Sequence, residues 1–236
     1  MRASKRALDV AIATLGMLAT WWLFAMIAIA VRIDSPGAVF YRQRRAGRFL
    51  GRDSDGRPMF SEFQMLKFRT MRPDAERYTG PVLASENDAR VTRVGRLLRK
   101  SRLDELPQLY NVLIGEMTLV GPRPERPELF ADLVLAIPFF EERLHGVAPG
   151  ITGLAQVSLG YSGHALPGSP IAEHELSLTN PWHFQQAHGA PADDMRLKLL
   201  YDLAYIAALE QFWTWLRLEL TIIAKTPWVM LRGLGR

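Results

Sequence analysis

The sequence of 236 residues contains no cysteine. This absence excludes disulfide bonds, thiolate metal sites and cysteine nucleophiles, so any bound metal ion must be held by oxygen or imidazole ligands. Internal repeats are also lacking. No two of the five histidines stand at the i, i+4 spacing of a zinc-binding helix, and we interpret them as non-ligands. Metal-dependent chemistry, if present, therefore depends on oxygen ligands.

A composition typical of disorder is absent as well, because 48% of the residues are hydrophobic and the length is sufficient for a substantial core. Acidic residues are scarce at the front of the chain. Residues 1–72 contain 13 Lys and Arg against 5 Asp and Glu, whereas residues 73–236 contain 16 against 19. A basic front predicts an anionic partner, which by composition alone is a nucleic acid, a membrane surface or a phosphorylated substrate.

Val10–Val31 is a run of 22 residues without a charge. A helix that rises about 1.5 Å per residue could cross a hydrocarbon core of about 30 Å over this length, and no cleavage site of a signal peptide follows. Basic residues flank both ends, so the orientation stays open, although the heavier downstream cluster favours a cytoplasmic location for the bulk of the chain. Two basic flanks also fit a helix that enters and leaves by one face of the membrane. A buried core helix is the alternative, but core helices rarely run this long without a polar face.

Turn signals and hydrophobic patterns divide the rest of the chain into short elements. Strand-like residues on either side of Asp53–Gly56 predict a β-hairpin within 38–71, to which we expect the strand content to be limited. The tryptophans and basic residues beside the apolar stripe of 193–231 are typical of a helix in a membrane interface, with ordinary core packing as the alternative. Helical patterns cover 90–102, 125–145 and 193–231, the last of which is broken at Pro227.

Two adjacent carboxylates, Asp104 and Glu105, follow a cluster of arginines. Because Pro107 is tolerated in the first turn of a helix, we expect a helix with Asp104 as its N-cap and Gly115 as its C-terminal stop. The helix dipole and the nearby cations are expected to keep Asp104 ionised. Neighbours on a helix point about 100° apart, so one carboxylate is expected to attack or bind and the other to hold a cation or transfer a proton. Capping is the simpler interpretation of such a pair.

Three basic residues have settings that suit phosphate. Lys67 and Arg69 alternate with Phe68 at strand spacing, which predicts that their side chains share one face. Arg123 stands between two prolines, on a stiff segment suited to bidentate binding of phosphate. Together with Mg²⁺, these cations would offset the repulsion between a carboxylate and a phosphate. A solvated strand face and a surface turn are the simpler interpretations.

Ordered motifs, spread over more than half of the chain, resemble those of one known family. The matching stretches are Lys5-Arg6 with Asp9, Lys67–Met71, Leu98–Gln108, Asn111–Pro124 and Pro149–Val157, with a looser match at Tyr201–Tyr205. On these motifs the chain resembles the bacterial sugar transferases, also called monotopic phosphoglycosyl transferases. Members of this family start the assembly of exopolysaccharide, O-antigen and glycoprotein glycans.

The resemblance implies transfer of a sugar-1-phosphate from a UDP-sugar to undecaprenyl phosphate, with release of UMP. Asp104 is then the expected nucleophile, which would form a covalent aspartyl-phosphosugar intermediate. Glu105 is the other half of the family's dyad, and the family's requirement for Mg²⁺ makes both carboxylates expected metal ligands. The resemblance further implies phosphate binding by Lys67, Arg69, Arg99 and Arg123, and a nucleotide pocket shaped in part by Gln156.

Two features depart from the family pattern. The family's re-entrant apolar segment is usually broken by a Ser-Pro pair, whereas this chain has Trp21-Trp22 there. A kink would have to come from elsewhere, such as Thr20 or packing against the domain. Tyr161–Pro191, rich in Gly, Pro, Ser and His, is longer than the usual link, and we expect this loop to contact the sugar.

These inferences predict an α/β, mostly helical catalytic domain with a membrane-inserted N-terminal helix, a small hairpin and interfacial amphipathic helices. The membrane helix is expected in residues 1–36 and the cytoplasmic catalytic domain in residues 37–236, at the bacterial inner membrane. The expected partners are a UDP-sugar, undecaprenyl phosphate and inner-membrane lipids, and a homodimer is one option. Nucleic acid is not expected, because the sequence has no recognition-helix or base-stacking motif. The alternative is a membrane-anchored scaffold or anionic-ligand-binding protein without catalysis, which would not need the acidic pair.

Overall fold

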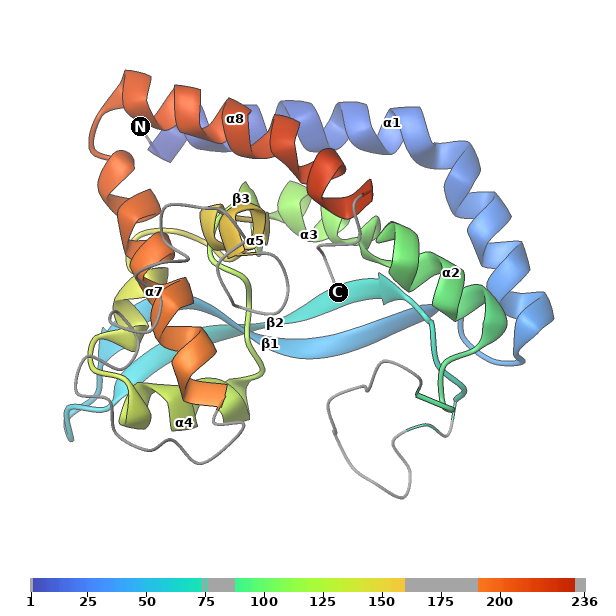
Figure 1. The fold of residues 1–236 in the computed structure, drawn as a ribbon, viewed down its shortest axis with the longest axis horizontal. Coiled ribbons are helices and arrows are strands. Elements are labelled where there is room, and N and C mark those ends of the chain that lie inside the picture. The colour runs from blue at the N-terminus through green and yellow to red at the C-terminus, as the bar shows by residue number, and fades with distance from the viewer. Residues whose placement is uncertain (1, 74, 76–87, 160–190, 232–236) are drawn as a thin grey trace.

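A long N-terminal helix, a β-hairpin and several shorter helices make up the described part of the chain (Figure 1). The structure is a computed structural model that describes residues 2–73, 75, 88–159 and 191–231. In chain order the elements are α1 (Arg2–Asp34), β1 (Phe40–Arg52), β2 (Pro58–Phe68), α2 (Arg93–Ser101), the 3₁₀ turn η1 (Leu103–Glu105), α3 (Gln108–Ile114), β3 (Thr118–Val120), α4 (Pro127–Ala136), the 3₁₀ turn η2 (Phe140–Leu144), β4 (Gly150–Thr152), α5 (Leu154–Leu159), α7 (Pro191–Ala208) and α8 (Phe212–Leu231).

The predicted β-hairpin is confirmed. Strands β1 and β2 pair antiparallel, with Phe40 opposite Phe68 at one end and Arg52 opposite Pro58 at the other. Their turn is closed by the Asp53 carboxylate, whose Oδ1 accepts hydrogen bonds from the backbone N–H groups of Asp55 (2.9 Å) and Arg57 (2.8 Å). Short polar side chains that bond to the backbone in this way favour turns. The hairpin carries its last residues, up to Phe68, to the centre of the molecule.

The prediction that strands are limited to the hairpin is wrong. Strands β3 and β4 form a second, parallel pair in which Thr118 is opposite Gly150 and Val120 is opposite Thr152. A Cβ atom on Gly150 would overlap the backbone of Gly121, so this close approach requires glycine. In the sequence the same glycine lies in a short Pro-Gly segment, which is typical of a turn.

Two predicted helices are each divided into two elements. Within 125–145, helix α4 ends before Ile137, which has the extended conformation that a following proline favours, and η2 begins after Phe139. Within 193–231 the predicted break at Pro227 is wrong. The chain turns between α7 and α8, where Leu209 N–H donates to Ile206 O, and Pro227 lies inside α8, near its end. Because proline has no backbone N–H, α8 continues past Pro227 without the hydrogen bond that this residue would otherwise donate to Ile223 O.

Helix α1 has two different halves. Figure 1 shows it passing over the domain and then bending downward in its second half. Thr20 Oγ1 donates a hydrogen bond to Gly16 O at 2.7 Å, a contact of the kind that often bends helices. Within the stretch Ala3–Asp34, the most apolar window has only 11% of its residues buried inside the protein, and the helix is long and apolar enough to cross a membrane. This low burial disfavours the core-helix alternative.

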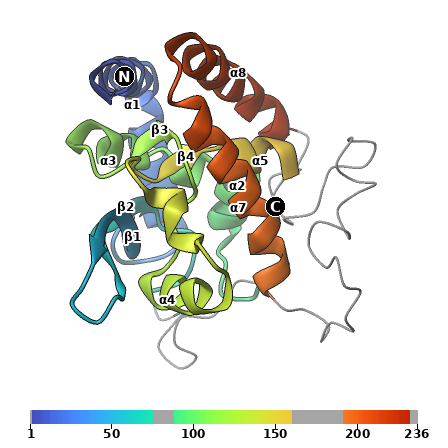
Figure 2. The ribbon, with the colours of Figure 1, turned by 90° about the vertical axis from the view of Figure 1, so that its left-hand side faces the viewer.

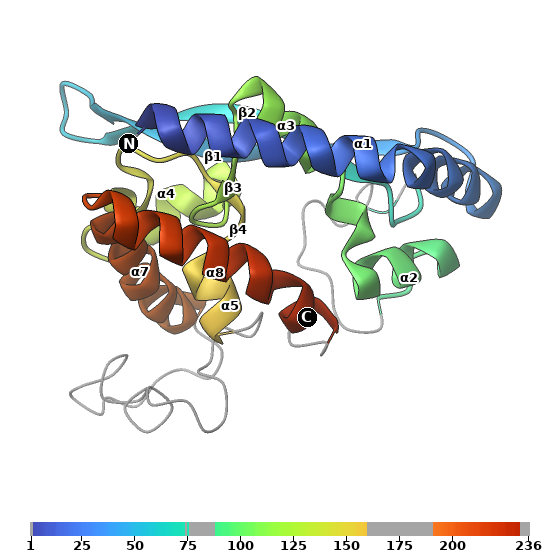
Figure 3. The ribbon, with the colours of Figure 1, turned by 90° about the horizontal axis from the view of Figure 1, so that it is seen from above.

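Helices α1 and α8 lie on the same side of the molecule, opposite α4 (Figures 2 and 3). One face of α8 belongs to the core, where Trp215 and Ile222 are buried. Its other face exposes large apolar groups, including Trp213, which is 78% exposed, and Trp228. Core packing therefore applies to one side of this helix, and the other side leaves an exposed apolar face.

A buried polar network joins the start of α1 to the core. Glu219 in α8 is fully buried and accepts hydrogen bonds from Lys5 Nζ, Tyr205 Oη (2.9 Å) and Trp215 Nε1 (3.1 Å). Asp9 accepts from Thr118 Oγ1 (2.6 Å) and from the N–H of the next residue in β3 (2.9 Å). The first half of α1 is thereby held against α7, α8 and β3.

We predict that Glu219→Gln lowers the free energy of unfolding by about 3 kcal/mol, because it leaves the buried Lys5 ammonium group with only the more distant Asp9 carboxylate, at 3.9 Å. Thermal unfolding in detergent micelles measures the loss. Glu210→Gln, which changes an exposed glutamate of the α7–α8 turn, is the matched control and should leave the midpoint unchanged. Equal midpoints for both variants would show that the network contributes little.

Candidate active site

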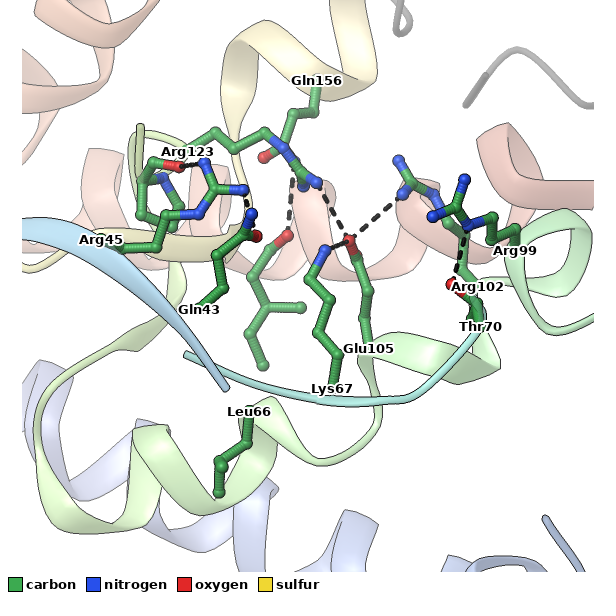
Figure 4. A network of polar contacts seen from close by, with 12 residues as sticks. Gln43, Arg45, Leu66, Lys67, Thr70, Arg99, Arg102, Glu105, Arg123 and Gln156 are labelled. Atoms are coloured by element: carbon green, nitrogen blue, oxygen red, sulfur yellow. Dashed lines mark hydrogen bonds and ion pairs between the residues drawn. The ribbon is translucent and has the colours of Figure 1, made fainter. Parts of the chain in front are cut away.

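Glu105 is the centre of a cluster of positive charges (Figure 4). Its Oε1 accepts hydrogen bonds from Lys67 Nζ at 2.9 Å, Arg102 Nη1 at 3.2 Å and Arg123 Nη2 at 3.0 Å. The cations come from the end of β2, from the residue between α2 and η1, and from the loop after β3. Glu105 is only 7% exposed. Segments far apart in the sequence thus meet at one carboxylate oxygen.

A sharp turn at Arg102 positions the acidic pair. Arg102 has a left-handed conformation, with φ of 58°, and its N–H donates to Arg99 O at 3.3 Å to end α2. Asp104 and Glu105 then lie in η1, and helix α3 begins only after Pro107. The prediction of Asp104 as the N-cap of one helix is therefore wrong. The predicted end at Gly115 is confirmed, with φ of 87°, although Gln108 rather than Asp104 opens that helix.

The two carboxylates have different electrostatic environments. Burial, together with the charge of Glu105, raises the pKa of Asp104 to about 6, against the opposing effect of Lys67. Burial alone would raise the pKa of Glu105 too, but Lys67, Arg123 and Arg102 outweigh it and hold that pKa well below its usual value. At neutral pH Asp104 stays mostly ionised, as expected, and Lys67, Arg102 and Arg99 favour its charge. The expected helix dipole does not contribute, because Asp104 lies in η1 and not at the start of α3.

Asp104 also has an available oxygen atom. The residue is 6% exposed, and its Oδ1 is buried without a hydrogen-bond partner among the described residues. An unpartnered buried carboxylate oxygen is costly unless it serves a ligand or a reaction. Lys67 and Arg102, two of the cations that bind Glu105, also act electrostatically on Asp104, as does Arg99. It is therefore the candidate reactive atom of the cluster.

Two further predicted site residues, Arg99 and Gln156, lie around this cluster. Arg99 Nε donates to Thr70 Oγ1 at 2.9 Å, next to Arg102 in Figure 4. Gln156 Nε2 donates to Ile151 O at 3.3 Å, while its Oε1 is buried without a hydrogen-bond partner among the described residues. Gln156 lines two pockets, one containing Glu105 and one containing Arg123.

Arg69 is not brought into the cluster. Its guanidinium group donates to Ser35 O at 2.5 Å and to Pro36 O at 2.9 Å, and so holds the loop that follows α1. Strand spacing predicted that Arg69 and Lys67 share a face, but β2 ends at Phe68. Beyond the end of a strand the alternation of side chains no longer applies.

Sequence reasoning missed two contributors. Arg102 belongs to the quoted motif before the acidic pair, but only its left-handed turn shows that it reaches Glu105. Arg45 of β1 donates to Pro124 O at 3.0 Å and to Gln43 Oε1 at 2.6 Å, which anchors the loop that carries Arg123. Burial lowers the pKa of Arg45 to about 10. Nothing in the sequence distinguishes Arg45 from the other arginines of its strand.

A second buried pair supports the same loop. Arg143 of η2 donates from Nε (2.8 Å) and Nη2 to Asp202 of α7, and both side chains are almost fully buried. Arg143 Nη2 also donates to Arg123 O at 3.3 Å. The backbone of Arg123 is thus held from one side by α7 through Arg143, while its guanidinium group points to Glu105.

The oxygen atoms of Asp104 and Glu105 are the kind of ligand that Mg²⁺ prefers. The ion is typically held by one or two carboxylates, with substrate phosphates and water completing its octahedron. Asp104 Oδ1 supplies an available oxygen next to the Glu105 carboxylate. Among the described residues no group of three or more His, Cys, Asp or Glu side chains could hold a metal by itself, so the substrate would have to contribute ligands. The predicted sugar-contacting loop, Tyr161–Pro191, lies outside the described residues except for its last position.

Several known proteins are similar to this chain in sequence. The chain is 36% identical over 231 residues, or 98% of its length, to a protein of Aeromonas hydrophila named UDP-N-acetylgalactosamine-undecaprenyl-phosphate N-acetylgalactosaminephosphotransferase, of which it covers 44%. It is 44% identical over 160 residues, or 68% of its length, to a UDP-glucose:undecaprenyl-phosphate glucose-1-phosphate transferase of Xanthomonas campestris pv. campestris, of which it covers 31%. The chain thus spans less than half the length of these two relatives.

A shorter relative matches over most of its own length. It is a putative undecaprenyl-phosphate N-acetylgalactosaminyl 1-phosphate transferase of Bacillus subtilis (strain 168), 40% identical over 142 residues, which are 60% of this chain and 73% of that protein. The family described as bacterial sugar transferase matches residues 1–233, which is nearly the whole chain. The protein therefore belongs to the bacterial sugar transferase family.

Proposed function

We propose that this protein transfers a sugar-1-phosphate from a UDP-sugar to undecaprenyl phosphate and releases UMP, as the first membrane step of polysaccharide or glycoconjugate assembly. The observation that carries the proposal is the buried pair in which Glu105 binds three cations while Asp104 Oδ1 has no hydrogen-bond partner in the described part of the chain. A nucleophile beside a fixed set of positive charges suits attack on a diphosphate. The names of the relatives supply the substrate classes.

The proposed reaction has two steps. In the first, Asp104 Oδ1 attacks the phosphorus that carries the sugar; the bond from this phosphorus to the bridging oxygen breaks, and UMP leaves with that oxygen. In the second, a phosphate oxygen of undecaprenyl phosphate attacks the same phosphorus and the bond to Asp104 breaks, which regenerates the carboxylate. The products are undecaprenyl diphosphate-sugar and UMP, so atoms and electrons balance.

The residues around Asp104 have separate tasks in this scheme. Lys67, Arg102 and Arg123 stabilise the negative charge that develops on the phosphoryl oxygens, and Glu105 holds these three cations in position. We assign phosphate binding to Arg99 as well, since Thr70 fixes its guanidinium group close to Arg102. Gln156 faces the nucleotide with its unpartnered Oε1. Arg69 acts indirectly, through the loop that it holds.

Mg²⁺ would be held by Asp104 and Glu105 together with the diphosphate of the substrate. When bound, it neutralises phosphate charge and so allows a carboxylate to approach an anion. The three cations around Glu105 remain the contribution of the chain itself to charge neutralisation.

Membrane association follows from α1 and from the lipid-linked acceptor named for the relatives. We propose that residues 1–36 form a re-entrant helix, supported by the bend near Thr20, and that residues 37–236 form the catalytic domain on the cytoplasmic face of the inner membrane. The exposed apolar face of α8, on the same side as α1, suits an interfacial helix. Nucleic acid has no role in this proposal, and a homodimer remains one option for the assembly.

Release of UMP tests the proposed function. The purified full chain in detergent is incubated with undecaprenyl phosphate, Mg²⁺ and a panel of UDP-sugars, and we expect UMP from at least one of them and a lipid-linked sugar diphosphate as the second product. Removal of Mg²⁺ with a chelator should stop both. A chain that binds undecaprenyl phosphate but releases no UMP with any UDP-sugar would instead support the alternative of a non-catalytic scaffold.

The contact between α2 and the end of β2 offers a further prediction. Gly95 packs so closely on Thr70 that a Cβ atom would overlap the Thr70 carbonyl group. Gly95→Ala should therefore displace α2, and with it Arg99 and Arg102, and lower kcat/KM for UMP release by about 100-fold. Arg96→Ala, an exposed change on the same helix, is the control and should retain full activity. Full activity of Gly95→Ala would mean that the position of α2 does not limit the reaction.

A further inference from the structure

An apolar pocket of about 140 Å³ lies next to the charged cluster. Among the described residues, Glu105 and Arg102 are the only charged ones that line it, and they lie together because Arg102 Nη1 donates to Glu105 Oε1 at 3.2 Å. The charge is thus confined to one end. The remaining wall is formed mainly by six apolar side chains: Leu106, Leu109, Ile151, Val157, Val229 and Met230.

The hydroxyl groups in this wall are already satisfied. Thr152 Oγ1 and Thr226 Oγ1 are 2.8 Å apart and hydrogen-bond each other, and Thr226 Oγ1 also donates to Ile222 O at 2.8 Å. Neither threonine therefore requires a polar ligand, and both present methyl groups as readily as hydroxyls. Away from its charged end, the pocket suits a hydrocarbon rather than a sugar or a nucleotide.

Helix α8 connects this pocket to the apolar side of the molecule. Its residues Val229 and Met230 line the pocket, whereas the neighbouring Trp228 is 57% exposed. The helix lies on the same side as α1, whose apolar residues are mostly exposed (Figure 3). A lipid chain in the pocket would thus pass from the charged cluster to the side of the protein that we place against the membrane.

Gln156 also borders a second, smaller cavity of about 40 Å³, whose lining carries charge from Arg123, Glu125, Arg143, Lys198 and Asp202. Charged side chains therefore lie on one side of Gln156, and the apolar pocket on its other side is a space that a UDP-sugar does not suit.

We propose that the apolar pocket binds the first isoprene units of the polyprenyl phosphate acceptor, with the lipid phosphate beside Arg102. The inference rests on the proposed function and adds the acceptor's place within the site. The pocket holds only the part of the chain next to the phosphate, and the rest of the isoprenoid lies in the membrane. Leu109, Val229 and Met230 then determine which lipid phosphates are used.

The test narrows the pocket and measures the two half-reactions separately. Val229→Phe fills space between α8 and α3, and Val229→Ser makes the wall polar without adding bulk. The donor half-reaction is followed by exchange of labelled UMP into the UDP-sugar without acceptor, and the complete reaction by KM for undecaprenyl phosphate and for a short-chain polyprenyl phosphate. Ala224→Phe adds the same bulk at an exposed position of α8 and serves as the control.

We expect both Val229 variants to raise the acceptor KM, by about tenfold for Val229→Phe, with UMP exchange within about twofold of the parent. The rise should be as large for the short acceptor as for the long one, because only the first units enter the pocket. An unchanged acceptor KM, or an equal loss of exchange and transfer in both variants, would overturn the inference. So would a KM rise confined to undecaprenyl phosphate, which would indicate that the pocket takes isoprene units far from the phosphate, which the short acceptor lacks. Absence of UMP exchange in the parent would instead contradict the proposed function.

Discussion

Asp104→Asn is expected to abolish UMP release, with a loss of more than about 10³-fold in kcat. The change replaces the buried, unpartnered Oδ1 by an amide group, which is a poor nucleophile, and leaves the size of the side chain nearly unchanged. Exchange of labelled UMP into the UDP-sugar should disappear together with turnover, because both need the covalent intermediate. Asp132→Asn, an exposed change in α4, should retain full activity.

Direct observation of the intermediate gives a second measurement. The parent, incubated with UDP-sugar and Mg²⁺ without acceptor, should gain the mass of one sugar phosphate, and hydroxylamine should remove it as expected for an acyl phosphate. Asp104→Asn should show no such gain. Unimpaired turnover by Asp104→Asn would exclude the covalent mechanism and would favour direct attack of the acceptor phosphate on the UDP-sugar.

Glu105→Gln is the second substitution for which we expect a large effect. Lys67, Arg102 and Arg123 share one oxygen of Glu105, so a neutral side chain leaves three cations close together without their common anion. We expect kcat/KM to fall by about 10³-fold and the free energy of unfolding to fall by about 3 kcal/mol. UMP release and thermal unfolding measure the two effects.

A matched control and a second variant make this prediction specific. Glu142→Gln removes a carboxylate that forms an exposed pair with His145, and it should change neither quantity. Arg123→Gln should lower kcat/KM far less in the Glu105→Gln background than in the parent, since the two side chains act as one unit. Additive losses in the double variant would show that Arg123 works independently of Glu105.

The sequence alone predicted the parts of the fold that depend on local pattern. The hairpin follows from alternation around the turn at Asp53–Gly56, and the end of α3 follows from Gly115, which adopts a positive φ with no steric cost. The apolar run Val10–Val31 likewise predicted a helix, which the structure extends to Arg2–Asp34. Each of these signals lies within a few residues of the structure that it specifies.

The predictions that the structure contradicts failed for a different reason. Strands β3 and β4 are short and pair across thirty residues, so neither has enough residues to show an alternation. The position of Asp104 depends on the left-handed turn at Arg102, and the chain turns between α7 and α8 rather than at Pro227. Arg69 departed from the predicted phosphate cluster because its strand ends one residue earlier. In all these cases packing between distant segments outweighed local preference.

The sequence by itself determined the chemical inventory of this protein: no thiol, an acidic pair, surrounding arginines, a long apolar run and the motifs of a bacterial sugar transferase. Only the tertiary structure decided how these groups divide their tasks. It placed three cations on Glu105 and left Asp104 Oδ1 without a hydrogen-bond partner among the described residues. It also raised the pKa of Asp104 and lowered that of Glu105. Burial and charge–charge contacts act over a few ångströms in space, and segments 38 and 18 residues from Glu105 reach that range only when the chain is folded.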